Sequence, residues 1–130
     1  MKNFLVAILF ILPFISNSQS YKKSEPFTHT YSIVARDSIT GEMGVAVQSH
    51  WFSVGSIVSW GKAGVGVVAT QSLVNPDYGP KGLVLMEEGL TPQQALDVLT
   101  ENDKGEMYRQ VAFLNSEGKV ATHTGSLCIN

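Results

Sequence analysis

The sequence has a single cysteine among its 130 residues, at position 128. One thiol cannot form an intrachain disulfide, whatever compartment the protein occupies. Cys128 has two possible roles, as a nucleophile or as a small buried side chain. A lone thiol in an apolar stretch is more often buried and inert, so we treat Cys128 as structural.

Charge is also scarce, because Asp, Glu, Lys and Arg make up 15% of the residues and the formal net charge is −2. The charged residues form neither a basic face nor an acidic tail. Nucleic acids and anionic membrane surfaces are bound through clustered positive charge. The sequence therefore predicts neither as a partner.

No hydrophobic run is long enough to span a bilayer comfortably, which takes about 20 residues in a helix. The longest, residues 4–15, follows Lys2 and precedes the small and polar residues 16–20. This order is typical of a cleaved secretory signal, although an uncleaved membrane anchor is the alternative. No cysteine follows the run to carry a lipid anchor. We therefore expect a signal peptide at residues 1–20, a linker at 21–29, and a secreted or periplasmic domain at 30–130 without a stable membrane anchor.

Familiar catalytic and metal-binding motifs are missing as well. His29, His50 and His123 lack the i,i+4 spacing of a zinc pair and have no Glu or Cys at ligand spacing. We therefore predict no metal site and no cofactor. A Ser-His-Asp triad remains open, although the sequence contains no Gly-x-Ser-x-Gly nucleophile elbow.

Residues 64–69 match part of a dinucleotide-binding fingerprint, but their context does not. The fingerprint needs a strand before the glycines and a helix that opens within them. Here Gly64 and Gly66 lie inside a β-branched run that continues into residues 70–72. Glycines within a strand more often mark the close approach of a packed neighbour, so we reject nucleotide binding.

Hairpins dominate the predicted secondary structure. Alternation and turn residues predict six strands, and two segments have helical character; the second helix opens with Thr91, Pro92 and Gln94 in a capping box. The expected strands are residues 30–36, 44–48, 56–60, 64–71, 108–114 and 119–124, and the expected helices are 83–88 and a segment from 91. The absence of βαβ alternation favours an α+β layer architecture with antiparallel sheets. The chain stops directly after a strand, so we expect the domain to be truncated at its C-terminus.

Polar residues gather at the ends of three of these strands. They are residues 48–50, 70–72 and 122–124. If neighbouring strands bring these ends together, they form a polar cluster where loops leave a rigid sheet, which is a common place for a site. Ordinary fraying of strands into solvated loops is the alternative.

From Thr30 onward the chain resembles a bacterial and archaeal family called domain of unknown function 1028. The blocks that carry the resemblance are residues 31–37, 40–49, 63–71, 75–80 and 118–125. The resemblance implies the fold of N-terminal-nucleophile hydrolases, a four-layer α-β-β-α sandwich. Members of that family run well beyond the point where this chain stops, which also implies truncation.

The resemblance further implies a mechanism. In such enzymes the first residue of the mature chain attacks an amide carbonyl, and its own α-amine is the general base. Thr30 is the residue that corresponds to this nucleophile. His29 precedes it here, so a free amine requires cleavage of the His29–Thr30 bond. A cut after Gln19 would instead expose Ser20, which the linker leaves without a fixed position.

Two functions follow as hypotheses. In the first, the protein is a secreted amidohydrolase that acts on a small-molecule or peptide amide; Thr30 is the nucleophile, and Gln48, His50, Gln71 and Asn75 line the pocket or stabilise an oxyanion. In the second, the same fold is a non-enzymatic module that binds a small molecule or a partner. The resemblance slightly favours the enzyme.

Overall fold

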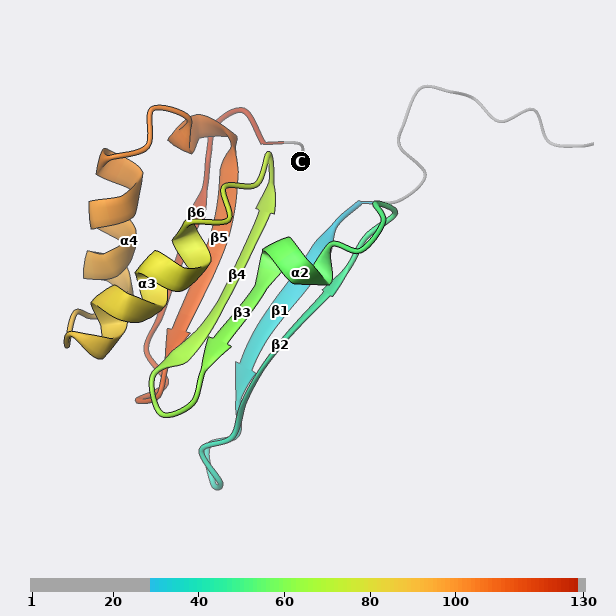
Figure 1. Cartoon of the computed structure of the whole chain (residues 1–130). Helices are drawn as coiled ribbons and strands as arrows, with labels where there is room; N and C mark the ends of the chain where they lie inside the picture. The colour runs from blue at the N-terminus through green and yellow to red at the C-terminus, as the bar shows by residue number, and fades with distance from the viewer. Residues whose placement is uncertain (1–28, 129–130) are drawn as a thin grey trace, which may run out of the picture.

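A computed structural model describes residues 29–128 of the chain, arranged in three layers (Figure 1). Two helices cover one face of a four-stranded antiparallel sheet, and a two-stranded antiparallel sheet lies against the other face. The α+β class with antiparallel sheets is thus confirmed. The predicted signal peptide and all of the predicted linker except His29 lie outside the described residues. No helix in the described part of the chain is long and apolar enough to cross a membrane.

The two-stranded sheet is the hairpin that alternation predicts. β1 (Tyr31–Arg36) pairs with β2 (Met43–Gln48) in a register that places Tyr31 opposite Gln48. Asp37 closes the turn, since its carboxylate accepts the backbone N–H groups of Ile39 and Thr40. Even-numbered residues of β1 and odd-numbered residues of β2 are half-buried, and the alternate residues are exposed. The hairpin therefore has one inner face, toward the larger sheet, and one outer face.

The four-stranded sheet has the order β3-β4-β5-β6. β3 (Ser59–Lys62) and β4 (Gly66–Ser72) form one hairpin, and β5 (Arg109–Asn115) and β6 (Val120–Thr124) form another. β4 and β5 pair at the centre, with Ser72 opposite Arg109. Because successive side chains alternate between faces, Val68 and Phe113 point toward the helices while Gln71 and Gln110 point toward β1 and β2.

The hydrophobic core lies between this sheet and the two helices α3 (Tyr78–Glu87) and α4 (Pro92–Glu101). Phe113, Val68, Tyr78 and Leu96 are almost completely buried there. Burial of such side chains supplies most of the favourable free energy of folding. The core therefore holds the sheet rigid, and the polar ends of β4 and β5 lie beyond it.

Several segments differ from the sequence-based prediction. Residues 56–60 were expected as a strand, but Gly55–Val58 forms one helical turn, α2, and β3 begins only at Ser59. Ser53, with a φ of 56°, turns the chain into α2. Local backbone geometry at the turn thus overrides the β preference of Ile57 and Val58.

The first long helix begins five residues before its predicted start at Leu83, and the short helix η1 (Glu106–Tyr108) was not predicted. Pro80 is the third residue of α3, where an N–H has no partner within the helix, so it costs no hydrogen bond. Gly79 and Gly82 are needed for packing: a Cβ at Gly79 would lie 2.2 Å from the Trp60 ring, and one at Gly82 would lie 2.5 Å from the Phe113 ring. Glycine usually indicates a loop, but Gly79 and Gly82 instead allow α3 to pack closely against the sheet.

The predicted capping box at Thr91 is confirmed. The Thr91 hydroxyl accepts the Gln94 N–H, and the Gln94 side-chain oxygen accepts the Thr91 N–H at 2.9 Å. We expect Thr91→Ala to lower the free energy of unfolding by about 1 kcal/mol, since it removes one partner of the box. Urea denaturation followed by circular dichroism measures this change. Gln93→Ala, on the same turn but outside the box, is the control and is expected to cost less than about 0.5 kcal/mol; equal losses would contradict the assignment.

Candidate functional site

Thr30 lies directly before β1, on the inner face of the hairpin. Its hydroxyl is 2.8 Å from the Ser49 hydroxyl, and Ser49 also accepts the Trp51 N–H at 3.1 Å. Gln71 reaches across from β4, where its side-chain Nε2 donates to the Thr30 carbonyl oxygen at 3.2 Å. The hairpin therefore holds the Thr30 side chain, and the four-stranded sheet holds the Thr30 backbone.

A row of polar side chains extends from Thr30 across the large sheet. Gln71 Nε2 also donates to Gln110 Oε1, and Gln110 Nε2 lies 3.4 Å from the Thr124 hydroxyl. Gln71 and Gln110 are opposite each other in the register of β4 and β5, as Gln110 and Thr124 are in β5 and β6. The predicted meeting of polar strand ends thus occurs through these residues and Ser49. The Gln71 Oε1 atom is buried and lacks a hydrogen-bond partner among residues 29–128.

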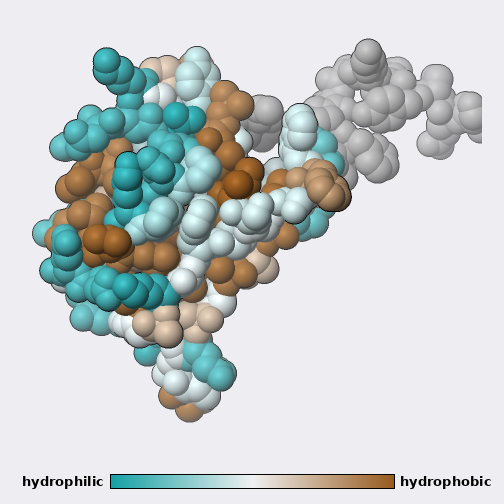
Figure 2. Space-filling view, viewed as in Figure 1, coloured by the Kyte–Doolittle hydropathy of each residue, from teal (hydrophilic) through white to brown (hydrophobic). Residues whose placement is uncertain are grey.

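A pocket of about 290 Å³ opens beside this row. We call it the Thr30 pocket; the residues that line it are Thr30, Trp51, Phe52, Val54, Ile57, Val58, Gln71, Ser72, Leu73 and Val74. Its walls come from the segment between β2 and α2, from α2 itself and from the loop after β4. Hydrophobic surface lies near the ends of β4 and β2, at the same end of the molecule (Figure 2). The pocket therefore combines a small polar group of atoms with apolar walls.

Two residues at the pocket have unusual backbone conformations. Ser72 has a φ of 69° and Ser53, next to the lining residues Phe52 and Val54, has a φ of 56°. Residues other than glycine rarely adopt positive φ, and such strain concentrates at functional sites. Both occur where the chain leaves a regular element to form the pocket wall. The pocket is therefore a candidate functional site.

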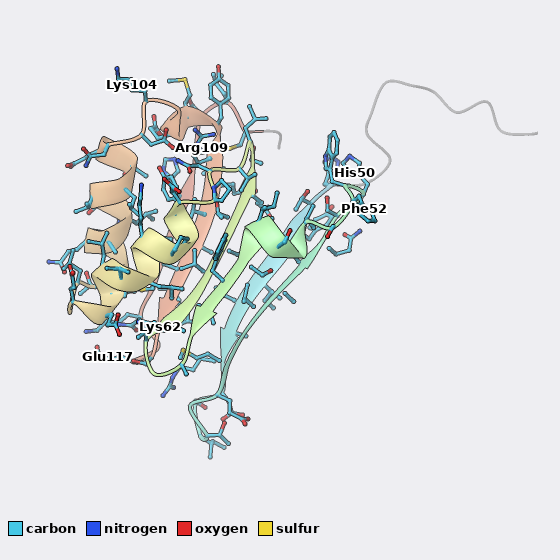
Figure 3. The ribbon with its side chains drawn as sticks, viewed as in Figure 1. His50, Phe52, Lys62, Lys104, Arg109 and Glu117 are labelled. Carbon is cyan, nitrogen blue, oxygen red and sulfur yellow. The ribbon has the colours of Figure 1, made fainter. Side chains whose placement is uncertain are left out.

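An ion pair fixes the loop after β4. Arg109 donates through Nε to Asp103 Oδ2 at 2.7 Å and through Nη2 to Oδ1 at 3.2 Å, while its Nη1 donates to the Leu73 carbonyl oxygen at 2.6 Å. The label in Figure 3 shows Arg109 next to the end of β4. Leu73 also donates its N–H to the Tyr108 carbonyl oxygen. The Asp103–Arg109 pair therefore holds one wall of the Thr30 pocket in place.

The structure separates the predicted site residues into three groups. Thr30 and Gln71 meet in the Thr30 pocket. Asn75 instead donates to Asp103 Oδ2 at 3.4 Å and so belongs to the ion-pair network behind the pocket wall. Gln48 is exposed on the outer face of β2, and His50 is exposed beyond the end of β2 with its ring centroid 5.3 Å from that of Trp51. Figure 3 shows His50 and Phe52 in this segment.

Sequence reasoning singled out Gln48, but the hairpin brings its neighbour Ser49 to Thr30. With Tyr31 opposite Gln48, the next residues outward along the two strands are Thr30 and Ser49. Alternation then places Ser49 on the inner face with Val47 and Val45. The turn at residues 37–42 could have indicated this register. The apolar walls and the Asp103–Arg109 pair left no comparable signal, because they depend on contacts between distant segments.

The histidines do not gather into one place. His123 Nε2 lies 2.9 Å from the Glu106 carbonyl oxygen and 3.1 Å from its carboxylate. His29 makes an edge-on contact with the Tyr31 ring. Within residues 29–128, no three His, Cys, Asp or Glu side chains form a group that could hold a metal ion. Cys128 is half-buried, and its thiol donates to the Arg109 carbonyl oxygen at 3.2 Å.

The Asp103–Arg109 pair predicts a pH-dependent stability. Hydrogen bonds from Arg109, together with those from Gly105 and Asn75, hold the pKa of the Asp103 carboxyl well below its usual range. Because the folded pKa is lowered, the pair stabilises the protein above the unfolded pKa of about 3.9, and this stabilisation is lost as the pH falls below that value. We expect Asp103→Asn to lower the free energy of unfolding by about 3 kcal/mol at pH 7. The loss relative to the unmodified protein shrinks toward pH 2, as denaturation at several pH values will measure.

The control for this prediction is Asp77→Asn. Asp77 pairs with Lys81 at 2.7 Å, but both side chains are mostly exposed. Exposed pairs contribute little, so we expect a change of less than about 0.5 kcal/mol. If Asp103→Asn costs no more than Asp77→Asn, the Asp103–Arg109 pair does not fix the loop.

Comparison with known proteins places this arrangement in a family. The model of the family of unknown function DUF1028 matches residues 30–130. None of the curated proteins matches the chain. Among solved structures, the fold is similar to the crystal structure of a DUF1028 protein from Silicibacter pomeroyi, with 33% sequence identity and a TM-score of 0.72 over 75% of this chain. The chain spans 46% of the length of that protein. The protein belongs to the family of unknown function DUF1028.

Proposed function

We propose that this protein is an exported amidohydrolase in which Thr30 is an N-terminal nucleophile. The observation that carries the proposal is the position of the Thr30 hydroxyl, which lies at the start of the first strand, between two sheets and in a pocket. Export is supported by residues 1–20, whose order of charge, apolar run and small polar residues is that of a secretory signal.

The layers support the N-terminal-nucleophile hydrolase-like sandwich as part of this proposal. Helices, a large sheet and a second sheet already occur in the order α-β-β. The outer face of the β1–β2 hairpin carries Tyr31 and Ile33, which are 64% and 62% exposed. A further helical layer over this face would bury both side chains and complete the α-β-β-α order.

The contacts of Thr30 fit the first chemical step. Once the His29–Thr30 bond is cut, one residue provides both a hydroxyl and an α-amine whose pKa of about 7.7–8.0 suits a general base near neutral pH. The hydroxyl proton passes to the amine as the oxygen attacks the amide carbonyl. The bond from Gln71 to the Thr30 carbonyl oxygen fixes the backbone beside the new terminus. Positioning of this kind removes much of the entropic barrier to attack.

The second candidate is a non-enzymatic module that binds a small molecule in the same pocket. The observation that favours it is the bond between His29 and Thr30, which leaves the Thr30 nitrogen as an amide with no basic lone pair. In such a module Gln71 and the apolar walls bind the ligand, and Thr30 only begins β1. The two candidates therefore differ in whether the His29–Thr30 bond is cut in the working protein.

The experiment is to purify the exported protein, determine its intact mass and N-terminal sequence, and assay the same preparation for hydrolysis of simple amides. The hydrolase predicts a chain that starts at Thr30 and is active. A chain that keeps His29 and binds ligands without hydrolysing them supports the binding module instead. Activity in a chain that keeps His29 would exclude the α-amine mechanism.

A further inference from the structure

The residues that line the Thr30 pocket indicate which kind of substrate it binds. Apart from Thr30, Gln71 and Ser72, the lining residues are aliphatic or aromatic, and none is an Asp, Glu, Lys, Arg or His. Phe52 and Trp51 are 98% and 69% exposed, so two large aromatic side chains stand unburied at this site. A ligand that covers this apolar surface is favoured when its own group is apolar and uncharged. A charged group would lose its hydration without a partner.

The size of the pocket limits what such a group can be. A cavity of about 150 Å³ is enough to bind benzene. The Thr30 pocket, at about 290 Å³, is at the small end of ligand-binding pockets and has room for a ring with a short spacer. A long chain or a fused ring system would extend past the rim.

The choice of an amide comes from the proposed function, in which the Thr30 hydroxyl attacks an amide carbonyl.

We infer that the Thr30 pocket binds the acyl group of an uncharged amide, and that this acyl group is apolar and of about the size of a phenylacetyl group. The inference rests on the proposed function for the choice of an amide and for the orientation of the ligand, with its acyl group next to Thr30. When Thr30 Oγ1 bonds to the carbonyl carbon and the C–N bond breaks, the amine leaves with the proton taken from the hydroxyl. The acyl group stays on Thr30 as an ester until water adds and the C–O bond breaks, which releases the carboxylic acid. The group next to Thr30 in the pocket is therefore the acyl group.

The test uses full-length exported protein with the Thr30→Ala substitution, so that binding is measured without turnover. Phenylacetamide, acetamide and succinamate are titrated separately and followed by the NMR shifts of pocket residues. We expect the dissociation constant for phenylacetamide to be at least about tenfold lower than those for the other two. Equal affinities, or a preference for the charged succinamate, would overturn the inference.

A matched pair of variants locates the binding. Ile57 lines the pocket and is 39% exposed, whereas Ile39 lies in the β1–β2 turn and is 93% exposed. Ile57→Ala should weaken phenylacetamide binding by about tenfold, and Ile39→Ala should leave it unchanged. If the two variants bind phenylacetamide equally well, the acyl group is bound elsewhere and the inference is wrong.

The same reagents separate this inference from the proposed function. One outcome is that the protein that retains Thr30 binds phenylacetamide selectively without hydrolysing it. That result would support an apolar ligand for the pocket and would exclude the hydrolase. Hydrolysis of acetamide or succinamate as fast as of phenylacetamide would sustain the hydrolase and exclude an apolar acyl pocket.

Discussion

Thr30→Ala is expected to lower the rate of amide hydrolysis by about 10³-fold or more, because it removes the atom that attacks the carbonyl. Thr30→Ser keeps a hydroxyl and an α-amine and is expected to retain activity within roughly tenfold of the unmodified protein. Initial rates with a chromogenic amide, at saturating and at low substrate concentration, measure both changes. Each variant must first be shown by its mass to begin at residue 30.

Ser49→Ala is the matched control for this pair. It removes the hydrogen bond between Ser49 and the Thr30 hydroxyl but leaves the nucleophile in place. We expect a loss of about 1 kcal/mol in stability or less, and a loss of activity well below that of Thr30→Ala. If Thr30→Ala keeps its activity, or if Ser49→Ala is equally inactive, Thr30 is not the nucleophile.

Gly66→Ala is expected to lower stability strongly. A Cβ at Gly66 would lie 2.5 Å from the Leu114 carbonyl oxygen and 3.2 Å from the Asn115 Cα, both backbone atoms of β5. The strands cannot move apart without breaking the central pairing of β4 and β5. We therefore expect a loss of about 3 kcal/mol or more in the free energy of unfolding, and a fall in melting temperature of roughly 15 °C.

Gly44→Ala is the control within the other sheet. Gly44 is also a strand glycine, but a Cβ there would meet no atom within 4 Å. Its replacement should be close to neutral or slightly stabilising, because alanine loses less conformational entropy on folding. Thermal denaturation followed by circular dichroism compares the two variants. A melting temperature for Gly66→Ala within a few degrees of that for Gly44→Ala would show that β4 and β5 do not approach as closely as described.

The same glycine shows what the sequence could predict. Gly66 lies in a β-branched run, which indicated close packing of strands, and β4 confirms this. Gly64 was predicted in the same strand, but it lies in the turn before β4 with a φ of 75°. The hairpins and the capped helix α4 were also predictable, because alternation, turn residues and the Thr91 box are local patterns. The start of α3 was not, because Gly79 and Gly82 look like loop residues until Trp60 and Phe113 are seen packed on them.

Some residues of the candidate site could likewise be predicted from the sequence, and others could not. Thr30 and Gln71 were identified from the resemblance and from their place at strand ends, and the structure brings them together. Ser49 could have been predicted from the register of the β1–β2 hairpin. Arg109 was not, since its contacts with Asp103 and Leu73 join segments 6 and 36 residues away in the chain. Non-local contacts of this kind follow from the way the layers pack, which no local pattern specifies.

The central claim is that the Thr30 oxygen becomes covalently acylated. The most direct measurement is to mix the exported protein with an amide substrate, quench in acid within the first turnovers, and map the protein by mass spectrometry. The account predicts one added acyl mass on the peptide that begins with Thr30, lost again on longer incubation and absent from Thr30→Ala. An acyl group on another residue, or hydrolysis with no acylated protein at any time point, would contradict it.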